Sequence, residues 1–345
     1  MRVTQSMMSR QYTRRVSDTL GNLNYVNKQV GTGRKFFKGS ENPAGAAKAY
    51  QLRRQSSQVN DYISNVDECV STLQTKESSM TQVSKALEDV YKSLLGVMNG
   101  TNNTPEDKAI VAQQFRAVQE TIVKDMNTKY GDKFIFGGAS VSEVPFELKD
   151  GVLTYRGVDV SGKNDYVWPE GTELAGTKTN AMDLLKQLST DSIYVDLGFG
   201  LSFEGDKIVS SSAYDSSTPG INVLGYGTDE NGLSNNIVLL IGEMATLLEN
   251  DCPQSALDPY LTKFNEQKQT VLNSITKTGS DSMFLEYTQT RLEDLQDNLA
   301  EKTSKTEYID AEEAIMNLNT IDYMFQALLK TGKNILSNSF IDFMS

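Results

Sequence analysis

The sequence predicts a mainly α-helical protein with a β-rich insert, in which the N- and C-terminal helices pair as a coiled-coil stalk. Both ends of the chain read as long helices with apolar stripes, and their charges are opposite. Residues 1–54 carry eleven Lys or Arg against two acids, whereas residues 283–345 carry five against eleven. Fifteen of the 25 glycines lie between Gly131 and Gly232. Amphipathic helices of opposite charge should pack together, so the glycine-rich middle is expected to project outward from a helical frame.

The first helix is expected over residues 6–30, because a 4-3-4-3-4 spacing places apolar side chains on one coiled-coil-like seam. Gly31 and Gly33 follow the last seam position and are expected to end the helix. Asn42 and Pro43 then supply an N-cap and a first-turn proline for a second helix. The seam consists of Tyr12, Val16, Thr19, Leu23, Val26 and Val30.

The second helix carries the strongest pattern in the chain. A 4-3 series from Leu52 to Met98 is mostly apolar and contains no proline. A helix of that length spans roughly 70 Å and needs partner helices along most of its course. A third helix is expected to start at Thr104-Pro105 and to return antiparallel, with Met126 near its end.

The composition changes after Tyr130, where short strands are expected. Residues 146–149 and 152–155 flank Asp150-Gly151 and predict a tight β-hairpin. Further strands are expected within 194–203 and 207–211, and a short helix within 180–188.

Helical periodicity resumes at Asn236 and again at Asp258-Pro259. Gly279 is expected to break the second of these helices, with Ser280-Asp281 restarting it. The last apolar stripe is expected to end before Gly332.

Composition argues against several classes of function. The net charge of −12 does not suggest a nucleic-acid partner. The chain has no histidine, which removes Ser-His-Asp and Cys-His catalysis and histidine-rich metal sites. We expect no enzymatic activity, no catalytic or metal site and no cofactor. The state of Cys69 and Cys252 is left open.

No signal peptide or membrane-spanning run is apparent. Residues 1–15 are polar and cationic, and the longest aliphatic run is 237–241. We therefore expect no membrane partner, and export of the chain would need a route that reads an uncleaved polar N-terminus.

Several motifs resemble the flagellin superfamily. Gly31-Thr32-Gly33-Arg34-Lys35, followed by Ser40-Glu41-Asn42-Pro43-Ala44-Gly45-Ala46-Ala47, is similar to its N-terminal signature. Pro43, the segment 131–138 followed by Pro145-Phe146, and the apolar end 340–344 resemble the hook-associated protein 3 branch, which forms the hook–filament junction. One departure from the pattern is Glu41-Asn42, where an Asp-Asp pair is common.

The resemblance implies a structural adaptor. It would join flagellin to the hook side through hook-associated protein 1, form a ring of identical subunits, and offer its C-terminal helix to a flagellar export chaperone. Residues 1–42 and 303–345 would form a terminal coiled-coil domain, 43–139 and 236–302 a long-helix bundle, and 140–235 a β-rich middle domain. The subunit would lie outside the cell in the flagellum, exported without a cleaved signal peptide.

Because the terminal stripes have little else to bury against, we expect them to form the assembly interface. Its residues are Tyr12, Val16, Leu20, Leu23, Val30, Leu318, Ile321, Phe325, Leu328 and Leu336. Three alternatives stay open: a filament flagellin, a secreted coiled-coil interaction protein, and an enzyme housed in the insert. The insert's acids, Asp191, Asp196, Glu204 and Asp206, scatter across turns and make the last one the weakest.

Overall fold

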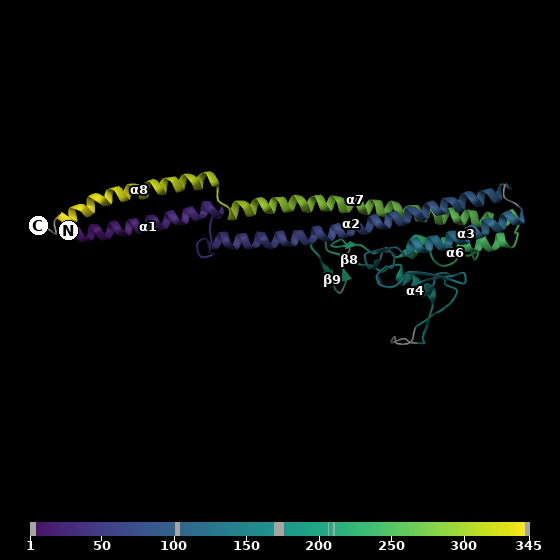
Figure 1. The fold of residues 1–345 in the computed structure, drawn as a ribbon. Coiled ribbons are helices and arrows are strands. Elements are labelled where there is room, and N and C mark those ends of the chain that lie inside the picture. The colour runs from purple at the N-terminus through teal and green to yellow at the C-terminus, as the bar shows by residue number, and fades with distance from the viewer. Residues whose placement is uncertain (1–4, 101–103, 169–175, 206, 210, 342–345) are drawn as a thin grey trace. The chain divides into compact units, whose positions relative to one another are not determined.

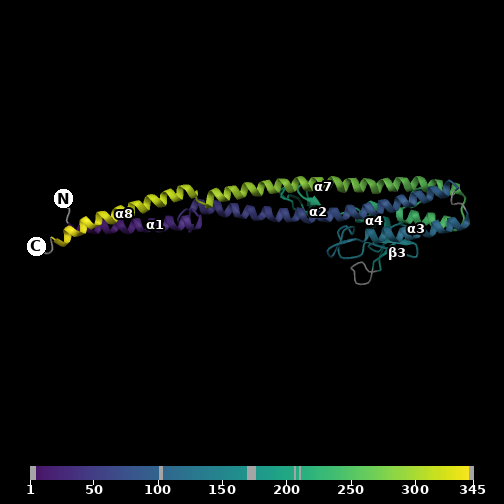
Figure 2. The same ribbon diagram turned by 45° about the horizontal axis from the view of Figure 1, so that its top comes forward.

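A computed structural model describes residues 5–100, 104–168, 176–205, 207–209 and 211–341, with side chains omitted at Gln5 and at 333–341. Backbone contacts divide the chain into two units (Figures 1 and 2). One unit joins Met1–Asp61 to Glu293–Ser345, and the other comprises Tyr62–Leu292.

Long helices form most of both units. Two of them, α2 and α7, contribute residues to each unit. The helices are α1 (Gln5–Thr32), α2 (Pro43–Met98), α3 (Pro105–Met126), α4 (Ala181–Leu188), α5 (Gly220–Leu224), α6 (Ile237–Glu249), α7 (Asp258–Glu307) and α8 (Ala311–Ile341), with a 3-10 turn at Gln254–Ala256.

The strands are short, and all their pairings are antiparallel within the described part of the chain. The largest sheet has the order β3-β4-β5. The paired strands are β1 (Lys129–Tyr130) with β2 (Lys133–Phe134), β3 (Phe146–Lys149) with β4 (Val152–Tyr155), β4 with β5 (Val158–Asp159), β6 (Tyr166–Val167) with β7 (Lys178–Thr179), β8 (Tyr194–Val195) with β11 (Tyr214–Asp215), and β9 (Phe203–Glu204) with β10 (Lys207–Ile208).

Local sequence signals explain where the elements begin. Thr104 accepts a hydrogen bond from the Asp107 amide at the start of α3, and Asn236 caps α6 through the amides of Val238 and Leu239. In the β3–β4 hairpin, Asp150 and Gly151 both have positive φ, 50° and 79°, as a tight two-residue turn requires. The hairpin register pairs Phe146 with Tyr155.

One apolar core runs through the 62–292 unit. It includes Leu87 and Leu94 of α2, Phe115 of α3, Ile241 of α6 and Phe264 of α7, all fully buried. Phe136, Phe146, Leu153, Tyr155 and Ile221 of the strand-rich segment belong to the same cluster. The strands therefore complete the core of the helices instead of forming a separate one. The predicted fold class, mainly α with a β-containing middle region, is confirmed.

Two predicted helix ends are wrong. Helix α7 continues through Gly279, and α8 continues past Gly332. A glycine costs a helix interior about 1 kcal/mol, which burial of flanking residues such as Val271 and Leu285 outweighs. Both cysteines are free and buried, and burial raises the pKa of the Cys69 thiol to about 11.

Candidate assembly surface

The terminal helices α1 and α8 lie side by side and form a two-helix seam (Figures 1 and 2). Eight of the ten predicted interface residues are half-buried there, and the seam heptads of α1 match the predicted spacing. Leu20 lies off the seam and is 42% exposed. Leu336 lies outside the residues whose side chains are described. The half-buried eight are Tyr12, Val16, Leu23, Val30, Leu318, Ile321, Phe325 and Leu328.

A close contact fixes the far end of the seam. The hydroxyl of Tyr12 donates a hydrogen bond to the carbonyl of Leu328 at 3.0 Å. Gly332 is buried against the same ring, and a Cβ at that position would lie 1.9 Å from the Tyr12 hydroxyl oxygen. The glycine therefore serves close approach of the two helices. Tyr12 and Gly332 are 320 residues apart in the sequence. The residues around Gly332, which predicted a helix end, could therefore not reveal this contact.

Two helices cannot cover each other completely. Among the described side chains of α1, none is fully buried, and in α8 only Ala314 and Gly332 are. Apolar side chains also stand outside the seam: Met7, Met8 and Leu20 on α1, and Ile315, Met316, Tyr323, Met324 and Leu329 on α8. A helix that is apolar on several faces is typical of one that is buried by further partners.

Charge contributes less to the pairing than the sequence suggested. In the described part of both helices, no ion pair joins α1 to α8. The basic residues of α1 and Glu312 and Glu313 of α8 instead remain on exposed faces, where water screens them, and Asp322 of α8 is half-buried. The expectation that opposite charges meet across this pair is therefore not realised as contacts.

The two connections that lead out of the terminal helices are tied to each other. Arg34 and Tyr308 form an antiparallel β-bridge. The amide of Lys35 donates to the carbonyl of Glu307 at 2.8 Å, and the amide of Ile309 donates to the carbonyl of Gly33 at 2.9 Å. Gly33 has a φ of 70°, the left-handed conformation that ends α1.

A buried carboxylate anchors this junction of the linkers. The side chain of Glu307 is 7% exposed, and its Oε2 pairs with Arg53 of α2. Within the described structure its Oε1 has no hydrogen-bond partner. Neither residue of this ion pair was singled out from the sequence, because a carboxylate in a polar helix end gives no periodic signal.

Glu41 organises the turn before α2. Its Oε2 accepts hydrogen bonds from the Phe37 amide at 2.8 Å and from the Tyr25 hydroxyl at 3.2 Å. The amide of Phe37 is the main cause that lowers the pKa of the Glu41 carboxyl. Asn42 then accepts from the Gly45 amide at 2.9 Å. Glu41 and Asn42 thus satisfy backbone amides of this turn and of the start of α2.

The residues that the structure describes contain no group of three or more Cys, Asp or Glu side chains placed to hold a metal ion. No described helix has the length and apolar character needed to cross a membrane.

Comparison with known proteins finds relatives for part of this chain. The model of the bacterial flagellin N-terminal helical region matches residues 3–140. Two curated relatives, the flagellar hook-associated protein 3 of Escherichia coli and that of Salmonella typhimurium, are 24% and 22% identical over 152 residues. The N-terminal part of the chain, residues 3–140, is thus similar to the flagellin family. The resemblance drawn from its motifs is thus confirmed.

The match to these flagellin-family relatives is partial. It covers 44% of this chain and spans 48% of the length of each curated relative. Solved structures extend the likeness in fold. A flagellar hook-associated protein from Vibrio parahaemolyticus aligns with a TM-score of 0.57 at 17% identity, covering 78% of this chain and 100% of that one. FlgL of Xanthomonas campestris aligns at 0.51 and 12% identity, covering 73% and 99%.

Proposed function

We propose that the chain is a structural subunit of the bacterial flagellum at the hook–filament junction. The single observation that carries this proposal is the open two-helix seam of α1 and α8 in a chain whose N-terminal part is similar to the flagellin family. Its half-buried stripe and exposed flanking residues, such as Met316 and Tyr323, have too few neighbours within one copy. Additional copies or partner subunits would bury them.

The proposed partners are those that the resemblance to hook-associated protein 3 implies. On one side the subunit contacts hook-associated protein 1, on the other it contacts flagellin, and identical copies form a ring. Tyr12, Val16, Leu20, Leu23 and Val30 of α1, with Leu318, Ile321, Phe325, Leu328 and Leu336 of α8, constitute the proposed interface. Before assembly, a flagellar export chaperone covers α8.

We further propose an assembly-based domain division. Residues 1–42 and 303–345 form the polymerising coiled-coil domain, 43–139 and 236–302 the long-helix bundle, and 140–235 the outward middle domain. The subunit has a mechanical role and no enzymatic one, and it lies outside the cell in the flagellum.

A deletion strain of the source bacterium tests this role. Loss of the gene is expected to leave hooks intact in electron micrographs while full-length flagellin accumulates in the medium as unattached monomer. Complementation in trans should restore attached filaments. Attached filaments in the deletion strain would contradict a junction role. A strain that lacks extracellular flagellin altogether would instead indicate that the chain acts in export.

A further inference from the structure

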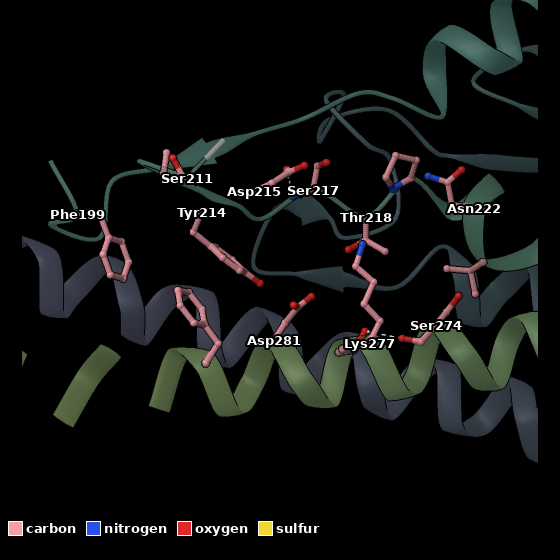
Figure 3. A pocket seen from close by; sticks show the side chains of 15 residues that line it. Phe199, Ser211, Tyr214, Asp215, Ser217, Thr218, Asn222, Ser274, Lys277 and Asp281 are labelled. Carbon is pink, nitrogen blue, oxygen red and sulfur yellow. Dashed lines mark hydrogen bonds between the residues drawn. The ribbon is translucent and has the colours of Figure 1, made fainter. Parts of the chain in front are cut away.

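A cavity of about 550 Å³ lies inside the 62–292 unit, on the side of α7 that faces residues 211–223 (Figure 3). Its size is that of a small-molecule site. It takes no part in the proposed assembly surface, whose residues all belong to the other unit. Its walls combine charged, hydroxyl and aromatic side chains.

Two opposite charges enter the cavity from one helix. Lys277 and Asp281 are one turn apart on α7, and both side chains project across the cavity toward the opposite segment (Figure 3). Among the residues that the structure describes, neither has a partner within hydrogen-bond or ion-pair distance. Burial raises the pKa of the Asp281 carboxyl, while Lys277 and Lys76 oppose that rise. An ammonium and a carboxylate therefore face the same space without pairing.

Several other polar groups of the lining are already engaged. Asp215 accepts from the amides of Ile193 and Ser217 at 3.1 and 3.0 Å. The Ser217 hydroxyl donates to the Asp191 carbonyl at 2.6 Å, and Asn222 donates to the Ser189 carbonyl at 2.8 Å. These bonds hold the wall in place, whereas Lys277, which is exposed, and Asp281, which is half-buried, have no partner among the described residues.

One end of the cavity is aromatic. The rings of Phe199 and Phe284 stack with centroids 5.8 Å apart, and Tyr214 stacks on Phe284 at 6.2 Å. The guanidinium carbon of Arg291 lies 4.5 Å from the centroid of the Phe199 ring. Phe199 and Phe284 remain 39% and 44% exposed, although aromatic rings of this size are usually covered. They offer an apolar surface next to the two charges.

A buried lysine of α2 holds segment 216–218, which forms the cavity wall opposite α7. Lys76 of α2 is 2% exposed, and its ammonium donates to the Ser216 carbonyl at 2.6 Å and to the Thr218 hydroxyl at 3.0 Å. Segment 216–218 is thereby held at a set distance from the helices. A preformed wall lowers the ordering cost that a ligand must overcome.

We propose that this cavity binds a small zwitterion with an apolar body, of the class of the apolar amino acids. Lys277 pairs with the ligand carboxylate, Asp281 pairs with its ammonium, and the apolar body lies against Phe199, Phe284 and Tyr214. A ligand with one charge would leave the other protein charge unpaired as water is displaced, and a neutral sugar would leave both. Only a zwitterion forms a charge-assisted bond at each end.

The test uses the purified chain and saturation-transfer NMR with calorimetry. The probes are L-phenylalanine, L-leucine and 6-aminohexanoate, which vary the body and the separation of the charges. Phenethylamine, 3-phenylpropanoate and glucose are the cationic, anionic and neutral comparisons. At least one zwitterion is expected to bind about tenfold more tightly than each comparison, since one lost charge-assisted bond is worth 1.4 kcal/mol or more.

Variants locate the binding. Lys277→Met and Asp281→Asn should each weaken the best zwitterion about tenfold. Lys302→Met and Asp294→Asn, exposed on the same helix and outside the cavity, are the matched controls and should leave it unchanged. Absence of binding by every zwitterion, equal binding by a singly charged probe or glucose, or equal affinity in the cavity variants would each overturn the proposal. Circular dichroism and thermal melts confirm that the variants are folded.

Discussion

Tyr12 and Leu328, 316 residues apart, are joined by a hydrogen bond from the tyrosine hydroxyl to the leucine carbonyl at 3.0 Å. It is a polar contact between the first and last long helices, in a seam that is mostly apolar. Since each helix alone buries little, this contact and Gly332 beside it define how α1 and α8 register. Their substitution therefore offers a direct test of the pairing.

Replacing Gly332 with Leu should separate the helices locally, because even a Cβ would lie 1.9 Å from the Tyr12 hydroxyl oxygen. Hydrogen exchange of the α1 amides around Tyr12 is expected to become faster, with the 62–292 unit unaffected. The double variant Tyr12→Ala, Gly332→Leu makes room for the new side chain and should recover part of the protection. Slow exchange in the single variant would show that the helices can pair at another spacing.

Phe325→Asp should block assembly, because it places a carboxylate in the half-buried seam at a cost of several kcal/mol once further subunits cover it. We expect export of the subunit to continue while flagellin appears in the medium unattached. Asn319→Asp, an exposed position on α8, is the matched control and should support normal motility. Attached filaments in the Phe325→Asp strain would exclude this face from the interface.

Arg53→Met should destabilise the unit formed by 1–61 and 293–345, because Glu307 would keep a buried carboxylate with no cation. The expected loss in free energy of unfolding is about 1–3 kcal/mol. Urea denaturation followed by fluorescence of a label on α1 would measure it. The double variant Arg53→Met, Glu307→Met removes the stranded charge and should be more stable than the single one; if it is less stable, Glu307 acts through contacts other than the ion pair.

Lys76 should make the stability of the 62–292 unit rise with pH just above neutrality. Burial lowers the pKa of its ammonium from 10.5 to about 8, so between these values the unfolded chain binds more protons than the folded one. From pH 8 to 9 the free energy of unfolding should increase by about 1 kcal/mol from this group.

The pH range in which the free energy of unfolding rises ends near pH 9, because ionisation of Cys69 lowers that free energy above this pH. The pKa of Cys69 rises from 9.0 to about 11 on folding, so the unfolded thiol loses its proton first and stability falls there. Lys76→Met should remove the increase between pH 8 and 9 in urea denaturation, whereas Lys85→Met, exposed on the same helix, should keep it. The same slope in both variants would assign the effect to another group.

Local signals in the sequence were sufficient for most of the helices. Asn42-Pro43, Thr104-Pro105 and Asn236 start helices where the caps predict, and Asp150-Gly151 forms the predicted turn. The seam of α1 was likewise evident from its spacing. These features depend on interactions within a few residues, which a sequence displays directly.

Features that depend on contacts between residues far apart in the sequence could not be predicted. Gly279 and Gly332 continue helices because of what packs beside them, and a glycine alone reads as an end. Lys76 occupies a position in α2 that periodicity treats as polar surface, yet it is 2% exposed because the 216–218 segment covers it. The Lys277–Asp281 cavity combines α7 with a strand-rich segment, and nothing in either stretch predicts the other.

The β-bridge between Arg34 and Tyr308 has a mechanical consequence. Two segments of backbone lead out of the terminal helices, one from α1 and one from α8. The hydrogen bonds of Lys35 and Ile309 join these two segments. Tension applied to α1 and α8 would therefore be divided between two backbone segments. Torque would have to break the hydrogen bonds between these segments before either one could rotate freely. Two connecting segments that are hydrogen-bonded to each other transmit rotation more directly than a single flexible linker would.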